Sequence, residues 1–456
     1  MTTKTQHQRK TALLLKEFNS SKNSSHKFTT NKKSTNLFRS RNQKNTKRLN
    51  MRDLNDVIAV NTKDQTALVE GMCSYQQLVE EALKHNLMPA VVPQLKTITL
   101  GGAISGIGIE SSSYQYGLAH ETVLEMQILT GDGKLTLASA SNQHKDLFYG
   151  FPNSYGTLGY ALSLKIKLIK TKPFVKLCYV LFDNAKDYYR AMQEACEKSE
   201  WKGEKIDFID GVIFDNHSMY LVLAQMTSTA PYQSNYKYQN IYYLAMLTRS
   251  EDYLTIKDYI WRWDTDWFWC SKNIGAQNPI MRKLYGPDRL KSEFYMKLFG
   301  IDAKYNLLPT IDKLLKKPKL EAIIQDVQLP IQSAEKFLTF FNKTIQIQPI
   351  WNCPVRQLSP KVEWSLFTMK PRLLYVNFGF WDSVIVGANL PQGYLNRKIE
   401  SVVKLLKGKK SLYSSSFYSK EEFWKLYNKK SYDILKSKYD PELRFKDLYQ
   451  KTVLKG

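Results

Sequence analysis

The sequence has few residues of the kinds that bind metals or form disulfide frameworks. Its five cysteines, Cys73, Cys178, Cys196, Cys270 and Cys353, are far apart, odd in number and never arranged as CxxC. The six histidines show neither HxxxH nor HExxH spacing. Structural zinc sites use closely spaced ligand pairs, and disulfide scaffolds use a dense, even set of cysteines. The sequence therefore predicts neither a bound metal nor a disulfide framework.

Long apolar runs are also missing. The chain contains no run of about 18 apolar residues, which is the minimum expected for a membrane-spanning helix. Near the N-terminus only Thr11–Leu15 forms an apolar patch, and it is too short for the core of a secretory signal. We therefore expect no membrane-spanning segment, and a cytoplasmic location by default.

Acidic residues are scarce at the N-terminus, where residues 1–50 contain only Glu17, and positive charge is concentrated at both ends of the chain. The net charge of +24 divides into +12 in residues 1–50, +9 in residues 396–456 and only +3 between them. Basic ends favour anionic partners, either nucleic acid or lipid headgroups, and a lysine-rich solvated surface is the alternative interpretation. The sequence lacks RNP-like and helix-turn-helix motifs, so we expect no nucleic-acid partner. A peripheral position at the inner face of an anionic membrane and a lysine-rich solvated surface remain the two hypotheses.

The length of 456 residues predicts at least two domains. Hydrophobic patterning predicts helices at His7–Phe18 and Tyr75–Lys84, the second with Ser74 as its N-cap. Predicted strands of the first half are Lys27–Thr30, Val57–Val60, Thr66–Glu70, Ile98–Leu100, the hairpin Val123–Thr130 with Lys134–Ser139, and Tyr160–Ile169. After residue 173 glycine becomes sparse and aromatic residues frequent, which indicates a second α+β domain ending near residue 390. A lysine-rich helical segment follows.

The most informative segment is PQLKTITLGGAISGIGIESSSYQYG, residues 93–117. Four glycines follow a predicted strand in it: Gly101, Gly102, Gly106 and Gly108. Glycine lets backbone N–H groups approach an anion without a Cβ in the way, and three serines supply further donors: Ser111, Ser112 and Ser113. The spacing excludes a Rossmann fingerprint, and no GK[ST] forms a Walker loop. A pyrophosphate site and plain tight turns remain the two interpretations.

The order of these motifs resembles the FAD-binding domain of the vanillyl-alcohol oxidase and para-cresol methylhydroxylase (PCMH) superfamily. The matching segments are VEGMCSYQQLVEEAL (69–83), LGGAISGIGIESSSYQYG (100–117), LTGDGKL (129–135) and DLFYGFPNSYGTLGYALSLKIKL (146–168). Within the superfamily the chain is most similar to the delta-24-sterol reductase branch and its bacterial relatives. Further segments carry that similarity: WRWDTDWFW (261–269), IIQDVQLP (323–330), LLYVNFGFW (373–381), SLYSSSFYSKEEFWKLY (411–427) and LKSKYDP (435–441).

The resemblance covers about residues 27–450 and implies an α+β fold with a PCMH-type FAD-binding domain and an α+β cap that holds the substrate. We expect a basic extension at 1–25, the FAD-binding domain at 26–172, the cap at 173–390, and a basic segment at 391–456 that returns to the flavin. The resemblance implies cofactor contacts at Ser34, Thr35, Asn36, the glycines and serines of 101–113, Gly156, Thr157 and Gly159. Loop 31–36 has neither His nor Cys, so we expect noncovalent FAD.

Candidate catalytic residues come partly from this resemblance and partly from their setting. The residues are Lys410, Tyr413, Tyr418, Arg356, Asn377 and His120. Lys410, Tyr413 and Tyr418 lie where the C-terminal segment of the superfamily approaches the flavin, and either a tyrosine, the lysine or His120 is expected to donate a proton. Arg356 is expected to pair with an anion and Asn377 to line the flavin, with structural roles as the alternatives. The tryptophans of 261–269 are expected either to wall an apolar substrate or simply to pack.

The resemblance implies an FAD-dependent reductase of a carbon–carbon double bond in a lipid, either sterol-like or a methylene-branched fatty acyl chain. NADPH is the expected electron donor, and reduction of a double bond needs a hydride on one carbon and a proton on the other. The sterol reductases of the family carry an N-terminal membrane segment that we do not find here. The alternative is an FAD-dependent oxidase or dehydrogenase of an alcohol or sugar. A weaker alternative is a basic nucleic-acid-binding protein without enzymatic activity.

Overall fold

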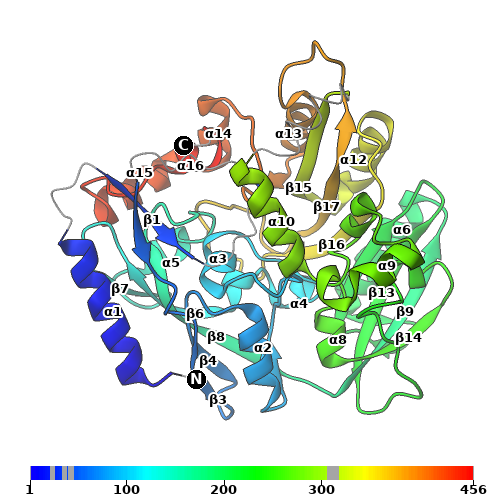
Figure 1. The fold of residues 1–456 in the computed structure, drawn as a ribbon, viewed down its shortest axis with the longest axis horizontal. Coiled ribbons are helices and arrows are strands. Elements are labelled where there is room, and N and C mark those ends of the chain that lie inside the picture. Colours follow the sequence, from blue (N-terminus) through cyan, green and yellow to red (C-terminus); the bar gives the residue numbers. More distant parts are fainter. Residues whose placement is uncertain (1, 21–25, 33–37, 40–45, 306–317, 455–456) are drawn as a thin grey trace.

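Two β-sheets, one in each half of the molecule, organise the chain (Figure 1). The computed structural model describes residues 2–20, 26–32, 38–39, 46–305 and 318–454. In Figure 1 the smaller sheet lies on the left and the larger on the right, with helix α10 (Ser292–Tyr305) crossing in front between them. The combination of antiparallel sheets and separate helices confirms the predicted α+β class.

The smaller sheet is antiparallel, with the order β3-β4-β8-β6-β7 and with β5 paired to β8. Its strands are β3 (Val57–Asn61), β4 (Thr66–Glu70), β5 (Leu87–Pro89), β6 (Val123–Leu129), β7 (Leu135–Ser139) and β8 (Tyr160–Lys170). In β8 the buried residues Leu164, Ile166 and Leu168 alternate with exposed lysines, as expected of a strand with one face in the core. A separate parallel pair, β1 (Lys27–Asn31) and β2 (Thr46–Asn50), precedes this sheet.

The larger sheet has eight strands in the order β14-β9-β13-β12-β16-β17-β15-β18, and all its described pairings are antiparallel. Its strands are β9 (Phe174–Phe182), β12 (Phe208–Ile213), β13 (Met219–Thr227), β14 (Glu251–Thr255), β15 (Leu320–Pro330), β16 (Ile350–Arg356), β17 (Leu374–Ile385) and β18 (Lys409–Lys410). A small hairpin, β10 (Glu200–Trp201) with β11 (Glu204–Lys205), lies beside it. The strand β18 comes from the C-terminal segment, so that segment is part of the larger sheet.

Helices cover both halves. Those of the first half and the C-terminus are α1 (Lys4–Asn19), α2 (Tyr75–Leu83), α3 (Leu100–Ser105), α4 (Ser113–Tyr116), α5 (Lys145–Gly150), α14 (Lys420–Leu426), α15 (Lys429–Tyr439) and α16 (Leu448–Thr452). The others are α6 (Ala185–Lys198), α7 (Tyr242–Ala245), α8 (Ile256–Ile260), α9 (Pro279–Tyr285), α10, α12 (Ile331–Thr344) and α13 (Tyr394–Leu405). In the described part of the chain we find no helix with the length and apolar character needed to cross a bilayer.

Most elements predicted for the first half are confirmed, with one exception. The hairpin β6–β7 forms, and Ser74 caps α2 by accepting a hydrogen bond from the Gln77 N–H. The strand predicted at Ile98–Leu100 is wrong, because Thr99 caps a short helix instead. The Thr99 hydroxyl accepts from the Gly102 N–H at 3.3 Å, and Leu100 N donates to Cys73 O at 2.9 Å. Within the segment only Thr99 keeps a β-bridge, an isolated antiparallel one to Ser74, so no strand forms among the described residues.

The basic N-terminal segment is docked on the folded body rather than held out in solvent. Its helix α1 buries Leu14 and Phe18 in a cluster with Phe28 and Phe445. On its polar side Lys10 Nζ lies 2.9 Å from Oε2 of Glu70, whose side chain is fully buried. One face of this basic helix therefore packs on the core, with His7, Thr11, Leu14 and Phe18 buried. A domain boundary at residue 25 stays a prediction.

Candidate active site

A cavity lies between the two sheets and receives residues from distant parts of the chain. The empty space in and around it is about 1870 Å³, a figure that includes open solvent at its mouth. The glycine-rich segment forms one wall, and the larger sheet with the turn 267–268 forms the other. Tyr413, Lys446 and Lys451 of the C-terminal segment also line it, so this segment does reach the cavity.

The glycine wall brings backbone to places where no side chain fits. Gly101 N donates to Gly71 O at 2.8 Å, and a Cβ on Gly101 would lie only 2.7 Å from that oxygen. A Cβ on Gly102 would lie 2.8 Å from the Thr99 hydroxyl that caps α3. A Cβ on Gly108 would lie 2.9 Å from that of Ala119. Packing against these neighbours therefore requires glycine, and the three residues line the cavity without side chains, so a bound group can contact their backbone.

The second glycine pair, Gly156 and Gly159, extends this wall. Both adopt positive φ, +75° and +141°, which side-chain-bearing residues rarely occupy. A Cβ on Gly159 would lie 2.6 Å from Leu129 O, and one on Gly156 would lie 3.5 Å from Lys451 Nζ. The pair therefore combines close backbone approach with a nearby cation, which suits an anionic ligand.

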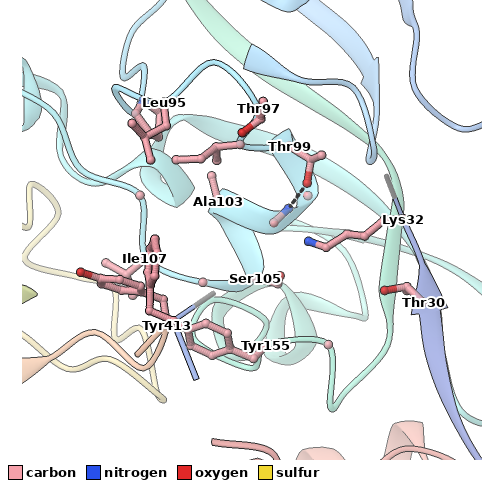
Figure 2. A pocket seen from close by; sticks show the side chains of 18 of the residues that line it. Thr30, Lys32, Leu95, Thr97, Thr99, Ala103, Ser105, Ile107, Tyr155 and Tyr413 are labelled. Carbon is pink, nitrogen blue, oxygen red and sulfur yellow. Dashed lines mark hydrogen bonds between the residues drawn. The ribbon is translucent and has the colours of Figure 1, made fainter. Parts of the chain in front are cut away.

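Most charged residues in the described lining of the cavity are cations. Lys32, Arg39, Lys446 and Lys451 line the cavity, and Asp326 is the sole acid among the described lining residues. The Arg39 guanidinium lies 4.9 Å from the Tyr155 ring and donates a hydrogen bond to Leu412 O. Figure 2 shows Lys32 and Thr30 on one side of the cavity and Tyr413 beside Ile107 on the other. The basic side of the cavity can accept an anionic group such as a pyrophosphate. The aromatic side can pack against a flat ring system.

Asp326 and Tyr413 form a hydrogen-bonded pair on the wall opposite the glycines. Tyr413 Oη donates to Asp326 Oδ2 at 2.7 Å, and Trp381 Nε1 donates to Tyr413 Oη at 2.9 Å. The pairing of β18 with β15 brings Tyr413 to Asp326, since Ser411 N donates to Asp326 O at 3.0 Å. Across the sheet Asp326 faces Gly379, where a Cβ would lie 2.9 Å from Asp326 Oδ1. The fold thus reserves room for this carboxylate.

The predicted residue Asn377 supports the pair without lining the cavity itself. Its Nδ2 donates to Asp326 Oδ1 at 2.6 Å, and its Oδ1 accepts from Gln328 Nε2 at 2.6 Å. Burial raises the pKa of Asp326 to about 6, although the hydrogen bonds from Asn377 and Tyr413 act in the opposite direction. Burial also raises the pKa of Tyr413, and the neighbouring Asp326 adds to the rise. The pair therefore holds its protons more tightly than isolated side chains do.

Aromatic residues complete this wall. Trp267, Phe268, Trp351 and Trp381 line the cavity, with the Phe268 and Trp381 ring centroids 4.4 Å apart. Three consecutive residues, Asp266, Trp267 and Phe268, have φ values of 67°, 44° and 60°. Such a run of left-handed residues is strained and needs external support. Arg282 supplies it through a bidentate ion pair with Asp266 in which both side chains are buried. The cluster therefore serves as a wall as well as packing.

Four residues predicted to contact the cofactor use their hydroxyls elsewhere, outside the cavity lining formed by the described residues. Ser111 Oγ bonds Glu110 and Tyr259, Ser112 Oγ donates to Ala90 O, and Ser113 Oγ accepts from Glu110 N. The Thr157 hydroxyl donates to Ser154 O at 2.7 Å. The first predicted phosphate loop, Ser34, Thr35 and Asn36, falls outside the described residues.

Besides Asn377, four other candidate catalytic residues lie outside the described lining. Lys410 Nζ forms a buried ion pair with Glu400 at 2.6 Å and donates to Ser415 O. Burial lowers the pKa of His120 to about 3, and its ring packs edge-on against Trp364. Tyr418 is buried among other aromatic rings, and Arg356 ends strand β16. Sequence reasoning missed Asp326, although an acid within the apolar strand IIQDVQLP was a usable signal.

Comparisons with known proteins agree with this geometry. A family model described as the FAD binding domain matches residues 12–139. The Delta(24)-sterol reductase of Rattus norvegicus is 26% identical over 418 residues, covering 88% of this chain and 77% of the reductase. The Delta(24)-sterol reductase of Arabidopsis thaliana is 24% identical over 443 residues, covering 88% of this chain and 75% of that reductase. Cytokinin dehydrogenase 3 of the same plant is 26% identical over 149 residues, 33% of this chain and 28% of its own.

The matched region contains the main glycine wall, and the residues present fit the cofactor that it implies. Close backbone approach and surrounding cations suit the pyrophosphate of FAD, and the aromatic side of the cavity suits its ring system. The protein is an FAD-dependent oxidoreductase. Its sequence is similar, over most of its length, to those of the delta-24-sterol reductases, a branch of the superfamily of vanillyl-alcohol oxidase and PCMH.

Proposed function

We propose that the enzyme binds FAD noncovalently and reduces a carbon–carbon double bond of a sterol-like or methylene-branched lipid with electrons from NADPH. The observation that carries the proposal is the hydrogen-bonded acid–phenol pair in the cavity wall, Asp326 with Tyr413, among aromatic residues and opposite the glycines. The similarity to Delta(24)-sterol reductases supports the substrate class. The described lining contains neither His nor Cys, the residue types to which flavin is attached covalently in some relatives of this superfamily.

Each wall has a separate task in this reaction. The diphosphate of FAD would be held by Gly101 and Gly102 together with the cations Lys32 and Lys451. When bound, the flavin ring of FAD would supply the hydride transfer. Trp267 and Phe268 would bind the apolar part of the substrate and exclude water. Tyr413 lines the cavity and carries a phenolic proton, so it would donate that proton to the carbon that does not receive the hydride.

The first test is anaerobic mixing of the yellow protein with NADPH. Loss of the flavin colour, followed by its return when a double-bonded sterol is added, supports the reductase. Mass spectrometry of the sterol should show a gain of two hydrogens. An alcohol or sugar that bleaches the flavin when NADPH does not would favour the oxidase or dehydrogenase instead. Acid precipitation tests the mode of attachment, because noncovalent FAD moves to the supernatant.

We further propose that the enzyme attaches reversibly to an anionic bilayer to collect its lipid substrate. On α9 and α10 large apolar side chains are exposed, including Ile280 at 71% and Leu284 at 69%, beside the exposed cations Lys283 and Lys297. Both helices lie on the near side in Figure 1. Tyr295 of α10 stacks on Trp267 of the cavity wall, which links this face to the substrate side.

This surface can be separated from the basic ends by vesicle co-sedimentation. The variant Ile280→Glu/Leu284→Glu should lose binding to anionic vesicles, whereas Leu405→Glu, at another strongly exposed apolar side chain, should keep it. The variant Lys4→Glu/Arg9→Glu/Lys16→Glu, at exposed positions of α1, tests the N-terminal contribution and leaves the buried face of the helix intact. Binding that persists in the double variant but disappears in this triple variant would return the role to the basic N-terminus. No binding by any form, even at low salt, would end the membrane proposal.

A further inference from the structure

We propose that Asp326 acts as a proton gate for Tyr413, holding the phenolic proton when ionised and releasing it to the cavity when protonated. This inference deepens the proposed reduction and rests on it for its catalytic meaning. The gate itself is a property of five side chains, and it can be tested on the protein without substrate. These side chains are Asp326, Tyr413, Trp381, Asn377 and Gln328.

The gate follows from counting donors and acceptors at the phenol oxygen. A tyrosine hydroxyl has one proton to donate and two lone pairs to accept with. Trp381 Nε1 is a permanent donor and occupies one lone pair at 2.9 Å. While Asp326 is ionised it can only accept, so the phenol proton points at Oδ2, 2.7 Å away, and is turned from the substrate.

Protonation of Asp326 reverses that bond. The new carboxylic acid can donate to the second lone pair of Tyr413 Oη, and the phenol proton is then free to point into the cavity. When Tyr413 gives this proton to the substrate carbon, its oxygen takes the proton of Asp326, and Asp326 becomes a carboxylate again. The double bond has then gained one hydride and one proton, and the carboxylate regains its proton from solvent before the next turnover.

The neighbours determine which carboxylate oxygen carries the proton. Asn377 Nδ2 donates to Oδ1 at 2.6 Å, so Oδ1 is occupied by a donor and the acidic proton belongs on Oδ2, next to Tyr413. Gln328 Nε2 donates to Asn377 Oδ1 and to Ser411 Oγ, which fixes the orientation of the Asn377 amide. Asn377 and Gln328 are therefore positioning residues in this proposal.

The charges around the pair decide the pH at which the gate works. Burial raises the pKa of Asp326 to about 6, against the two hydrogen bonds that lower it. The Arg39 guanidinium lies against the Tyr155 ring and donates to Leu412 O, and Lys410 on the adjacent strand is paired with Glu400. Since protonated Asp326 is the active form, the proton-transfer rate is highest below pH 6 and falls about tenfold per pH unit above it.

Infrared difference spectroscopy tests the gate directly, with FAD present or absent. Wild type should show a buried carboxylic acid that titrates near pH 6, and Asp326→Asn should lack it. Glu121→Gln is the matched control, because burial raises the pKa of Glu121 to about 7 outside the cavity lining of the described residues. That variant should lose a different band and keep the one assigned to Asp326. A spectrum in which Asp326→Asn changes nothing between pH 5 and 7 would overturn the proposal.

Single-turnover oxidation of the reduced enzyme by a double-bonded sterol gives the catalytic readout. Wild type should lose rate above pH 6, whereas Asp326→Asn should have a flat profile with normal flavin content. An unchanged inflection in Asp326→Asn would also overturn the gate. Absence of any sterol reduction, together with an Asp326 titration near pH 6, would refute the proposed function while supporting the gate, so the two failures can be told apart.

Discussion

The two walls of the cavity are built in different ways. The main part of the glycine wall comes from one short segment, Gly101–Gly108, and at its glycines only backbone faces the cavity. The opposite wall combines Asp326, Trp381 and Tyr413, which are far apart in the chain and are brought together by β15, β17 and β18. A backbone site is encoded by a local motif, whereas a side-chain site depends on the register of three strands. This difference predicts that binding and chemistry can be damaged separately.

The largest expected effect is on the glycine wall. Gly102→Val should abolish FAD loading, because even a Cβ would lie 2.8 Å from the Thr99 hydroxyl and a branched side chain would occupy the cavity. Flavin content, measured by absorbance after purification, checks this. Gly300→Val is the matched control, since Gly300 lies on α10 and a Cβ there would meet no atom of the described residues within 4 Å. Normal flavin in soluble Gly102→Val protein would contradict the assignment.

The second effect belongs to the opposite wall. Tyr413→Phe should keep its FAD and its reduction by NADPH, yet reduce the double bond roughly 10²- to 10⁴-fold more slowly, the usual contribution of a positioned acid. Stopped-flow absorbance separates the two half-reactions. Tyr418→Phe should have a normal rate, because Tyr418 lies outside the described lining. Equal losses in the two variants would remove Tyr413 from its proposed role.

A third change tests the strained turn that carries Trp267 and Phe268. Asp266→Asn leaves the buried guanidinium of Arg282 without its counter-charge, which should cost about 3–5 kcal/mol of folding stability. Chemical denaturation measures this cost. Asp288→Asn removes an exposed partner of Lys291 and should leave the denaturation midpoint unchanged. A wild-type midpoint for Asp266→Asn would show that the turn needs no such support.

The smallest expected effect is at Trp381. Trp381→Phe keeps an aromatic ring in the wall but removes the N–H donor to Tyr413 Oη. One hydrogen bond contributes about 1 kcal/mol, so the proton-transfer rate should change about fivefold and flavin content not at all. Rapid-reaction kinetics at pH 6 resolves a change of this size. A loss as large as that of Tyr413→Phe would mean that Trp381 has more than a positioning role.

The same contrast explains what sequence could and could not predict. The fold class, the cofactor and the glycine positions follow from local motifs that resemble a family. The directions in which side chains point cannot be predicted from such motifs. Ser111, Ser112 and Ser113 adjoin the glycines in sequence, but their hydroxyls bond protein groups as the chain turns into α4. Lys410 and Tyr413 are three residues apart in the C-terminal segment. In the described lining of the cavity, however, only Tyr413 is present.

The account is tested most directly by one anaerobic experiment on wild type, Gly102→Val and Tyr413→Phe. NADPH is added first, a double-bonded sterol second, and flavin absorbance is followed throughout. We predict that wild type bleaches and recovers, that Tyr413→Phe bleaches but recovers roughly 10²- to 10⁴-fold more slowly, and that Gly102→Val shows no flavin signal. Recovery of Tyr413→Phe at the wild-type rate, or a wild type that NADPH does not bleach, would contradict the division of the cavity into a binding wall and a proton-donating wall.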